Sequence, residues 1–150
     1  MSYNLSSFTW TGWGEDGIEP QATDRRVGLD AARNNLRLTQ ELDRGDGPLC
    51  NGYWLLGAHL LTAGDDEAAV TAFQKAREHG QASGRAEGGL LAEGYLALTA
   101  LLSSPDDADA LEAFAKAKAD LVPVEEGESY IQQLDTALRV LGEKRVRCRV

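Results

Sequence analysis

The side chains that could perform chemistry are few, and the densest group is an acidic run, Asp65, Asp66 and Glu67. Such a run could contribute to a metal site, but a metal needs three or four converging ligands. His59 and His79 have no partner at ligand spacing. Acids at the start of a helix cap free N–H groups and interact favourably with its dipole. We therefore interpret the run as a helix start and expect no bound metal.

Nucleophilic and cofactor chemistry are equally unsupported by the sequence. Cys50 and Cys148 are the only cysteines, and their spacing matches no metal or redox motif. They are interpreted as buried or idle thiols in a reducing compartment. No nucleophile–histidine pair stands out, and neither a G-x-x-x-x-G-K-[ST] loop nor a strand-borne G-x-G-x-x-G occurs. The sequence predicts a protein that is not an enzyme and has no cofactor.

Length and charge narrow the class of protein further. A chain of 150 residues is expected to form one main domain that buries roughly two-thirds of its unfolded surface. The net charge of −9 argues against general nucleic-acid binding. The apolar runs are too short to span a membrane, and the N-terminal residues lack the pattern of a secretory signal. A cytoplasmic protein is expected, without nucleic acid or membrane as partners.

The charge is unevenly distributed along the chain. Residues 46–135 contain 16 acidic and 5 basic residues, a balance of −11, whereas residues 139–150 contain 5 basic residues and one acidic residue, a balance of +4. The sequence thus predicts an acidic body followed by a basic C-terminal tail, residues 143–150.

Two amphipathic helices are predicted between Tyr53 and Ala76. Their apolar or small residues recur three or four positions apart, at Tyr53, Leu56, Gly57 and Leu60 in the first and at Ala69, Phe73 and Ala76 in the second. The glycine and alanines allow close approach of two backbones, and the large residues fill the space around them. The pattern predicts an antiparallel helical hairpin broken at Gly64 and Asp65.

The hairpin pattern is repeated 41 residues later. Ten of the 24 positions from Tyr53 to Ala76 are identical at this single offset, without a gap: Leu55/Leu96, Leu60/Leu101, Leu61/Leu102, Asp65/Asp106, Asp66/Asp107, Ala69/Ala110, Ala72/Ala113, Phe73/Phe114, Lys75/Lys116 and Ala76/Ala117. One offset kept across a turn indicates an internal repeat.

These residues resemble the tetratricopeptide repeat (TPR) family, whose signature combines an aromatic residue, Leu-Gly, a further large residue and an A-x3-F-x2-A run. In the second copy Gly94 replaces the aromatic, Ala97-Leu98 replaces Leu56-Gly57, and Ser104-Pro105 replaces the glycine turn. The period is 41 instead of the family's 34, and the seven extra residues are assigned to a long helix over about residues 85–102.

The resemblance implies an all-α fold, a short right-handed superhelical stack of antiparallel hairpins. Six helices are expected in a TPR-like domain over residues 23–142, with one flanking helix at about 24–43 and another at about 126–141. The glycines between Gly80 and Gly94 indicate either close approach of a neighbouring helix or a helix that begins only at Gly89.

The two ends of the chain have separate patterns. Residues 1–22 carry Tyr3, Phe8, Trp10 and Trp13 among small residues, which predicts an extended aromatic arm that docks on its own domain or on a partner. Arg145 to Val150 alternate basic and apolar residues, a two-residue period suited to a strand edge.

Members of the resembled family bind peptides on the concave surface formed by the first helix of each hairpin. The corresponding residues here are Asn51, Trp54, Ala58, Leu61 and Thr62, which map at the same offset onto Ala92, Tyr95, Thr99, Leu102 and Ser103. A clamp for a C-terminal carboxylate is not expected, because only Asn51 matches its usual residue types.

The resulting hypothesis is a non-catalytic adaptor or accessory subunit that binds a protein segment in an apolar aromatic groove. Two alternatives remain open. Trp54 and Tyr95 are simply buried, or the chain is a structural homo-oligomer whose arm or tail docks into a neighbouring copy.

Overall fold

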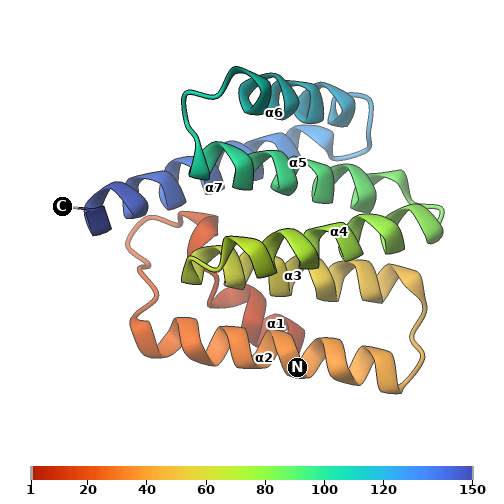
Figure 1. The fold of residues 1–150 in the computed structure, drawn as a ribbon. Coiled ribbons are helices and arrows are strands. Elements are labelled where there is room, and N and C mark those ends of the chain that lie inside the picture. The colour runs from red at the N-terminus through yellow and green to blue at the C-terminus, as the bar shows by residue number, and fades with distance from the viewer. Residues whose placement is uncertain (1, 150) are drawn as a thin grey trace.

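The computed structural model describes residues 2–149, and it is all-helical over that range (Figure 1). Seven α-helices and one 3-10 helix follow one another: α1 Ser2–Phe8, η1 Thr11–Trp13, α2 Ala22–Glu41, α3 Asp46–Ala63, α4 Asp66–Ala82, α5 Ala86–Ser103, α6 Ala108–Leu121 and α7 Gly127–Arg149. The all-α prediction is confirmed. The six expected helices correspond to α2–α7, and the additional helices lie in the N-terminal segment.

Acidic side chains begin several of these helices. Asp24 accepts a hydrogen bond from the backbone N–H of Gln21 (2.8 Å) at the start of α2. Asp65 accepts one from the N–H of Ala68 (3.2 Å), and Asp107 accepts one from Asp109 (3.1 Å). The interpretation of the acidic run as a helix start is therefore confirmed for Asp65. A carboxylate placed there satisfies donors that the helix itself leaves unpaired.

Consecutive helices pack against each other, α3 on α4, α4 on α5 and α5 on α6. In Figure 1 the chain rises from α2 at the bottom to α6 at the top, and α7 returns behind α5. The first hairpin has the close contact expected of it. A Cβ added at Gly57 would lie 2.7 Å from a ring carbon of Phe73, so only glycine lets this ring approach α3.

The glycines between α4 and α5 mark a close crossing of the two backbones. A Cβ on Gly80 would lie 2.4 Å from the backbone nitrogen of Gly89. A Cβ on Gly94 would lie 2.6 Å from a methyl group of Leu134 in α7. Close approach is thus the correct explanation. The alternative, a helix beginning only at Gly89, is wrong because α5 begins at Ala86.

The N-terminal segment is not extended, contrary to the sequence-based expectation. Residues 2–8 form α1, and residues 11–13 form the single turn η1. The chain folds tightly at Gly12, where a Cβ would lie 2.2 Å from the Trp10 ring. Both elements pack on the chain's own helices, α1 on α2 and η1 on α7. Docking on its own domain is therefore what the structure shows, and residues 2–13 are called the docked segment below.

The C-terminal residues are helical, so the proposed strand edge is wrong. Helix α7 continues past Gly142 to Arg149, and Val150 lies outside the described residues. Helical spacing puts Leu138, Leu141 and Arg145 on one face. Leu141 is buried and Arg145 pairs with Asp66 in α4. These contacts across the fold outweigh the local two-residue alternation.

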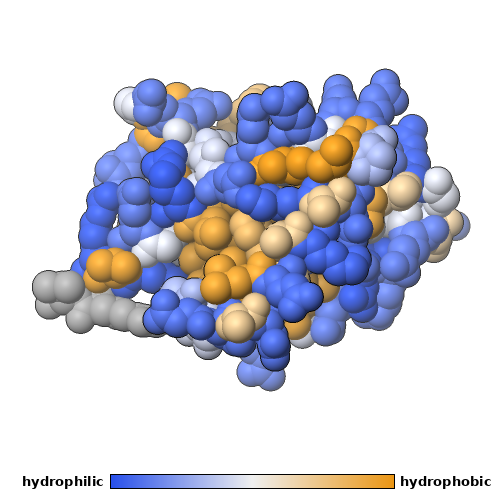
Figure 2. Space-filling model, turned by 90° about the horizontal axis from the view of Figure 1, so that it is seen from above, coloured by the Kyte–Doolittle hydropathy of each residue, from blue (hydrophilic) through white to orange (hydrophobic). Residues whose placement is uncertain are grey.

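The α6 end of the molecule exposes hydrophobic side chains among hydrophilic ones (Figure 2). Leu111 in α6 and Val122 just after it are both exposed. The opposite face of α6 belongs to the continuous core, which extends through α3, α4, α5, α6 and α7. No helix within residues 2–149 has the length and apolar character needed to cross a membrane.

Candidate binding groove

Most of the residues predicted to bind a partner are buried. Trp54, Ala58, Leu61, Tyr95, Thr99 and Leu102 are inaccessible or nearly so, Thr62 is half-buried, and only Asn51 is exposed. Of the residues related to them by the repeat, Ala92 is buried and Ser103 is exposed. The predicted aromatic surface exists, but the chain itself covers most of it.

Trp10 of the docked segment covers the centre of this surface. Its side chain is 1% exposed, and its ring centroid lies 5.8 Å from that of Trp54 and 6.0 Å from that of Tyr95. The indole N–H donates to the carbonyl oxygen of Ala58 and to the hydroxyl of Thr62, both at 3.0 Å. An intramolecular tryptophan thus occupies the position that the sequence assigned to a partner.

Helix α1 adds a second group of contacts. The buried hydroxyl of Ser6 donates to the carbonyl oxygen of Gly28 (2.8 Å). The Nε2 atom of His59 donates to the carbonyl oxygen of Ser6 (2.9 Å), which requires a proton on that nitrogen. Burial lowers the pKa of His59, so the neutral imidazole is favoured. Neither Ser6 nor His59 was identified from the sequence, since a lone serine and histidine carry no pattern.

Three further residues of the predicted set, all in α5, contact α7 or their own helix. The Tyr95 hydroxyl accepts a hydrogen bond from Gln133 of α7 (2.8 Å), and burial raises the Tyr95 pKa. The Thr99 hydroxyl donates to the Tyr95 carbonyl (2.7 Å). A Cβ on Gly142 would lie 3.8 Å from a methyl group of Leu102. Helix α7 therefore closes the second half of the predicted surface.

An open cavity of about 880 Å³ remains beside the docked segment, and we call it the groove. Its walls come from α1, η1, the start of α3, the α4–α5 turn, the start of α5 and α7. Asn51 and Trp54 belong to the predicted set and line it. Its other lining residues include Tyr3, Trp13, Leu91, Tyr130 and Gln133. The contribution of α7 was missed, because the repeat pattern does not include this helix.

The contact between the docked segment and the groove wall leaves two polar atoms unpaired. Within residues 2–149, the indole N–H of Trp54 and the hydroxyl of Thr11 are buried without a hydrogen-bond partner. Both atoms belong to elements that meet here, Thr11 to η1 and Trp54 to α3.

Two side chains that can react, Cys50 and His79, lie at or beside the groove. Burial, with a smaller effect from Glu87, raises the pKa of the Cys50 thiol, which disfavours the nucleophilic thiolate. His79 stacks on Tyr53 and its Nδ1 lies 2.8 Å from an Asp46 oxygen. Among residues 2–149, no three His, Cys, Asp or Glu side chains converge as a metal would require. The side chains that line the groove are aromatic and polar, as in many binding surfaces.

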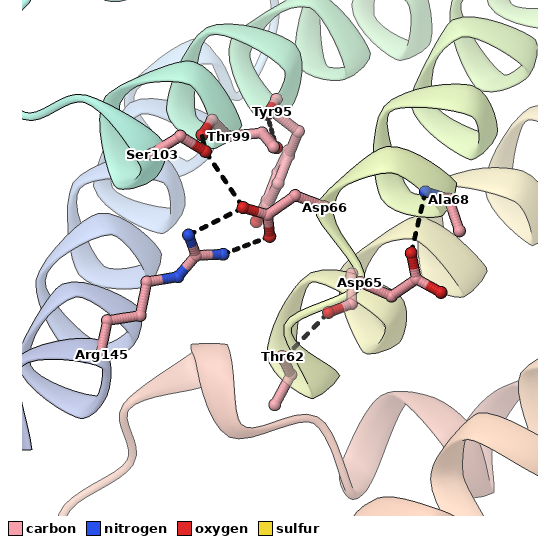
Figure 3. Close-up of polar contacts among 9 residues, drawn as sticks. Thr62, Asp65, Asp66, Ala68, Tyr95, Thr99, Ser103 and Arg145 are labelled. Carbon is pink, nitrogen blue, oxygen red and sulfur yellow. Dashed lines mark hydrogen bonds and ion pairs between the residues drawn. The ribbon is translucent and has the colours of Figure 1, made fainter. Parts of the chain in front are cut away.

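A polar cluster at the C-terminal ends of α5 and α7, away from the groove, connects both helices to the start of α4 (Figure 3). Both guanidinium NH2 groups of Arg145 donate to the Asp66 carboxylate, one at 2.9 Å, and Ser103 donates to the same carboxylate (3.0 Å). Three helices, α4, α5 and α7, thus meet at Asp66. This contact could not be predicted from sequence patterns, since Asp66 and Arg145 are 79 residues apart.

Comparisons with protein-family models, with curated proteins and with solved structures find no significant match to this chain.

Proposed function

We propose that this chain is a non-catalytic protein-interaction module, a TPR-like adaptor or accessory subunit that acts in the cytoplasm. In this proposal the consecutive hairpins form a short right-handed superhelical stack, and a segment of another protein binds in the groove. The observation that carries the proposal is the groove itself, an open cavity of about 880 Å³ lined by Trp13, Trp54 and Tyr130. Concave sites lined by aromatic residues with a few polar groups are the usual binding sites of proteins.

Two further observations support a protein segment as the ligand. The groove runs over the first helices of the two repeated hairpins, α3 and α5. In addition, the docked segment places a short helical turn against the same wall, with Trp10 hydrogen-bonded to a main-chain carbonyl. A peptide from a partner would use the adjacent part of this surface.

Selection of peptide ligands tests the proposal. The full chain is immobilised and presented with phage displaying random twelve-residue peptides, and the enriched peptides are synthesised and titrated by fluorescence anisotropy. Asn51→Trp, which fills the groove from an exposed position, should reduce their affinity at least tenfold without changing the Tm. Asn34→Trp provides the matched control, since Asn34 is exposed on α2 and lines none of the three described cavities. Peptides that bind both variants equally, or no enriched peptide at all, would contradict the proposal.

A structural homo-oligomer is the second candidate, and the connection of the docked segment favours it. Residues 14–21 join the docked segment to α2, and among them residues 15–19 and Gln21 are exposed, whereas Pro20 is buried. Gly14 and Gly17 adopt positive φ angles of 61° and 78° there. Such a linker lets the docked segment of one copy exchange into another. Light scattering decides this point, since exchange produces dimers without any added partner.

A further inference from the structure

The open groove contains aromatic rings from four different elements. Tyr3 comes from α1, Trp13 from η1, Trp54 from α3 and Tyr130 from α7. Trp54 is nearly inaccessible, whereas the other three are half-buried and present part of their side chains to the cavity. Faces of aromatic rings carry partial negative charge and attract cations, with tryptophan the most effective.

The ionised groups lining the groove are mainly acidic. Asp46 and Glu87 contribute carboxylates, and Arg85 is the single basic side chain among the lining residues that the structure describes. His79 lies against Asp46, but Glu87 forms no ion pair within residues 2–149. Glu87 is half-buried in the first turn of α5, so its charge acts in a partly desolvated site.

Two more carboxylates lie near the Tyr130 end of the groove. Glu125 and Glu126 precede α7, and together with Glu87 they add to the effect of burial in raising the pKa of Tyr130. All three charges that act on this ring are negative. The helices that form most of the groove also belong to residues 46–135, whose charge balance is −11. A field of one sign attracts oppositely charged segments before contact.

We infer that the segment held in the groove is basic, with an arginine or lysine side chain placed among Tyr3, Trp13 and Tyr130 and within reach of Glu87. This inference rests on the proposed function and specifies its ligand. Arginine fits such a site better than lysine, because its planar guanidinium stacks on aromatic faces and binds a carboxylate through two N–H groups. An acidic segment would place like charges beside Asp46 and Glu87.

The composition of selected peptides tests the inference. Peptides that bind the wild-type chain but not Asn51→Trp are groove ligands, and they should contain Arg and Lys well above the frequency in the starting library. Synthetic versions are acetylated and amidated so that their termini carry no charge. Their affinity should fall severalfold between 50 and 300 mM salt, because ion pairs that are partly exposed are screened.

Variants of single charges assign the effect to Glu87. Glu87→Gln keeps the shape of the side chain and should weaken the basic peptides about three- to tenfold. Glu112→Gln serves as the control, since Glu112 is exposed on α6 and lines none of the described cavities. Arg85→Ala should strengthen binding. Groove ligands with no excess of Arg and Lys, or with the same affinity for Glu87→Gln, would overturn the inference and leave the proposed function standing. If no peptide binds in the groove, both fail.

Discussion

Trp10 has more interactions with the body of the molecule than any other residue of the docked segment that the structure describes. It contacts Trp13, Trp54 and Tyr95 through its ring, and its N–H is hydrogen-bonded to α3. Burial of so large a side chain stabilises the fold by about 2–3 kcal/mol, and each hydrogen bond adds about 0.5–1.5 kcal/mol. Trp10 therefore contributes strongly to holding the docked segment, alongside the hydrogen bonds of Ser6 with Gly28 and His59.

Replacement of Trp10 measures this contribution. Trp10→Ala should lower the free energy of unfolding by about 3–5 kcal/mol, because it removes a buried aromatic and leaves a cavity. Phe8→Ala is the matched control two residues away, since Phe8 is 79% exposed, and it should change the value by less than about 0.5 kcal/mol. Urea unfolding measures both. Equal effects of the two substitutions would show that the docked segment does not pack as described.

The burial of Trp54 changes an expectation drawn from the sequence. If Trp54 were exposed in the groove, as the sequence predicted, Trp54→Ala would weaken partner binding without lowering the stability of the isolated protein. Trp54 is 7% exposed and is surrounded by Trp10, Trp13 and Tyr95. Trp54→Ala should therefore lower the Tm by several degrees, and Asn51 is the better position for changing the groove.

His59 should make stability depend on pH. Its pKa is lowered in the folded chain by burial, whereas in the unfolded chain it stays near 6.5. Below about pH 6.5 the unfolded state binds a proton that the folded state does not, so the free energy of unfolding falls as the pH decreases. The slope approaches about 1.4 kcal/mol per pH unit for one group.

Comparison with a variant that does not titrate isolates this effect. Between pH 7.5 and 5.5 the wild type should lose more stability in urea unfolding than His59→Gln, because the two proteins differ at this one side chain. Parallel pH profiles for the two proteins would mean that His59 is not buried in neutral form against Ser6.

At the scale of the helices, small residues decide which elements approach closely. The ring of Phe73 lies where a Cβ of Gly57 would be, and Gly80 meets Gly89 backbone to backbone. The first contact could be predicted, because Gly57 and Phe73 belong to one recurring pattern in neighbouring helices. The second could be stated only as one of two explanations, since glycine in a helix gives the same signal for a close crossing and for a late start.

Two helical glycine substitutions separate packing from helix propensity. Alanine stabilises a helical position by about 0.5–1 kcal/mol relative to glycine where the added methyl group has room. Gly142→Ala in α7 should show this gain, because the nearest atom to the added Cβ is a methyl group of Leu102 at an ordinary contact distance of 3.8 Å. Gly57→Ala should instead destabilise by about 1–3 kcal/mol, because the added methyl group overlaps the Phe73 ring. A stabilising Gly57→Ala in thermal unfolding would contradict the hairpin described here.

The ends of the chain were the least predictable elements. Local composition indicated an extended arm and a strand-like tail, but both ends are helical because each meets a surface formed far away in sequence. Arg145 reaches Asp66 across 79 residues, and Ser6 reaches His59 across 53. Periodicity describes the neighbours of a residue along the chain. It contains no information on such distant partners.

The two arginines of α7 make the role of its C-terminal part testable. Arg145 is 23% exposed and binds Asp66 through both NH2 groups, so Arg145→Ala should destabilise by about 1–2 kcal/mol after allowance for solvent screening. Arg147 is 74% exposed and lies 3.6 Å from Glu143, so Arg147→Ala should be nearly neutral. Chemical denaturation of both variants checks the difference. An unchanged free energy of unfolding in Arg145→Ala would show that the C-terminal part of α7 does not stabilise the fold.

At the scale of the whole molecule, the all-helical fold class and part of the candidate groove could be predicted from the sequence. The 41-residue offset predicted two helical hairpins, and the helices at both repeats lie where expected. Asn51 and Trp54 line the groove, whereas Ala58, Thr62 and Tyr95 contact Trp10, and Tyr95 and Leu102 lie against α7. The repeat pattern could not show this, because the docked segment and α7 lie outside the repeated residues.

Hydrogen–deuterium exchange of the full chain with a selected peptide tests the groove most directly. We expect the peptide to slow exchange in backbone amides around the open cavity, at the starts of α3 and α5 and in the first two turns of α7, while α2 and α6 are unchanged. The same peptide added to Asn51→Trp should protect none of these regions. Protection centred on α2 or α6, or equal protection in the Asn51→Trp variant, would contradict the assignment of the groove as the binding site.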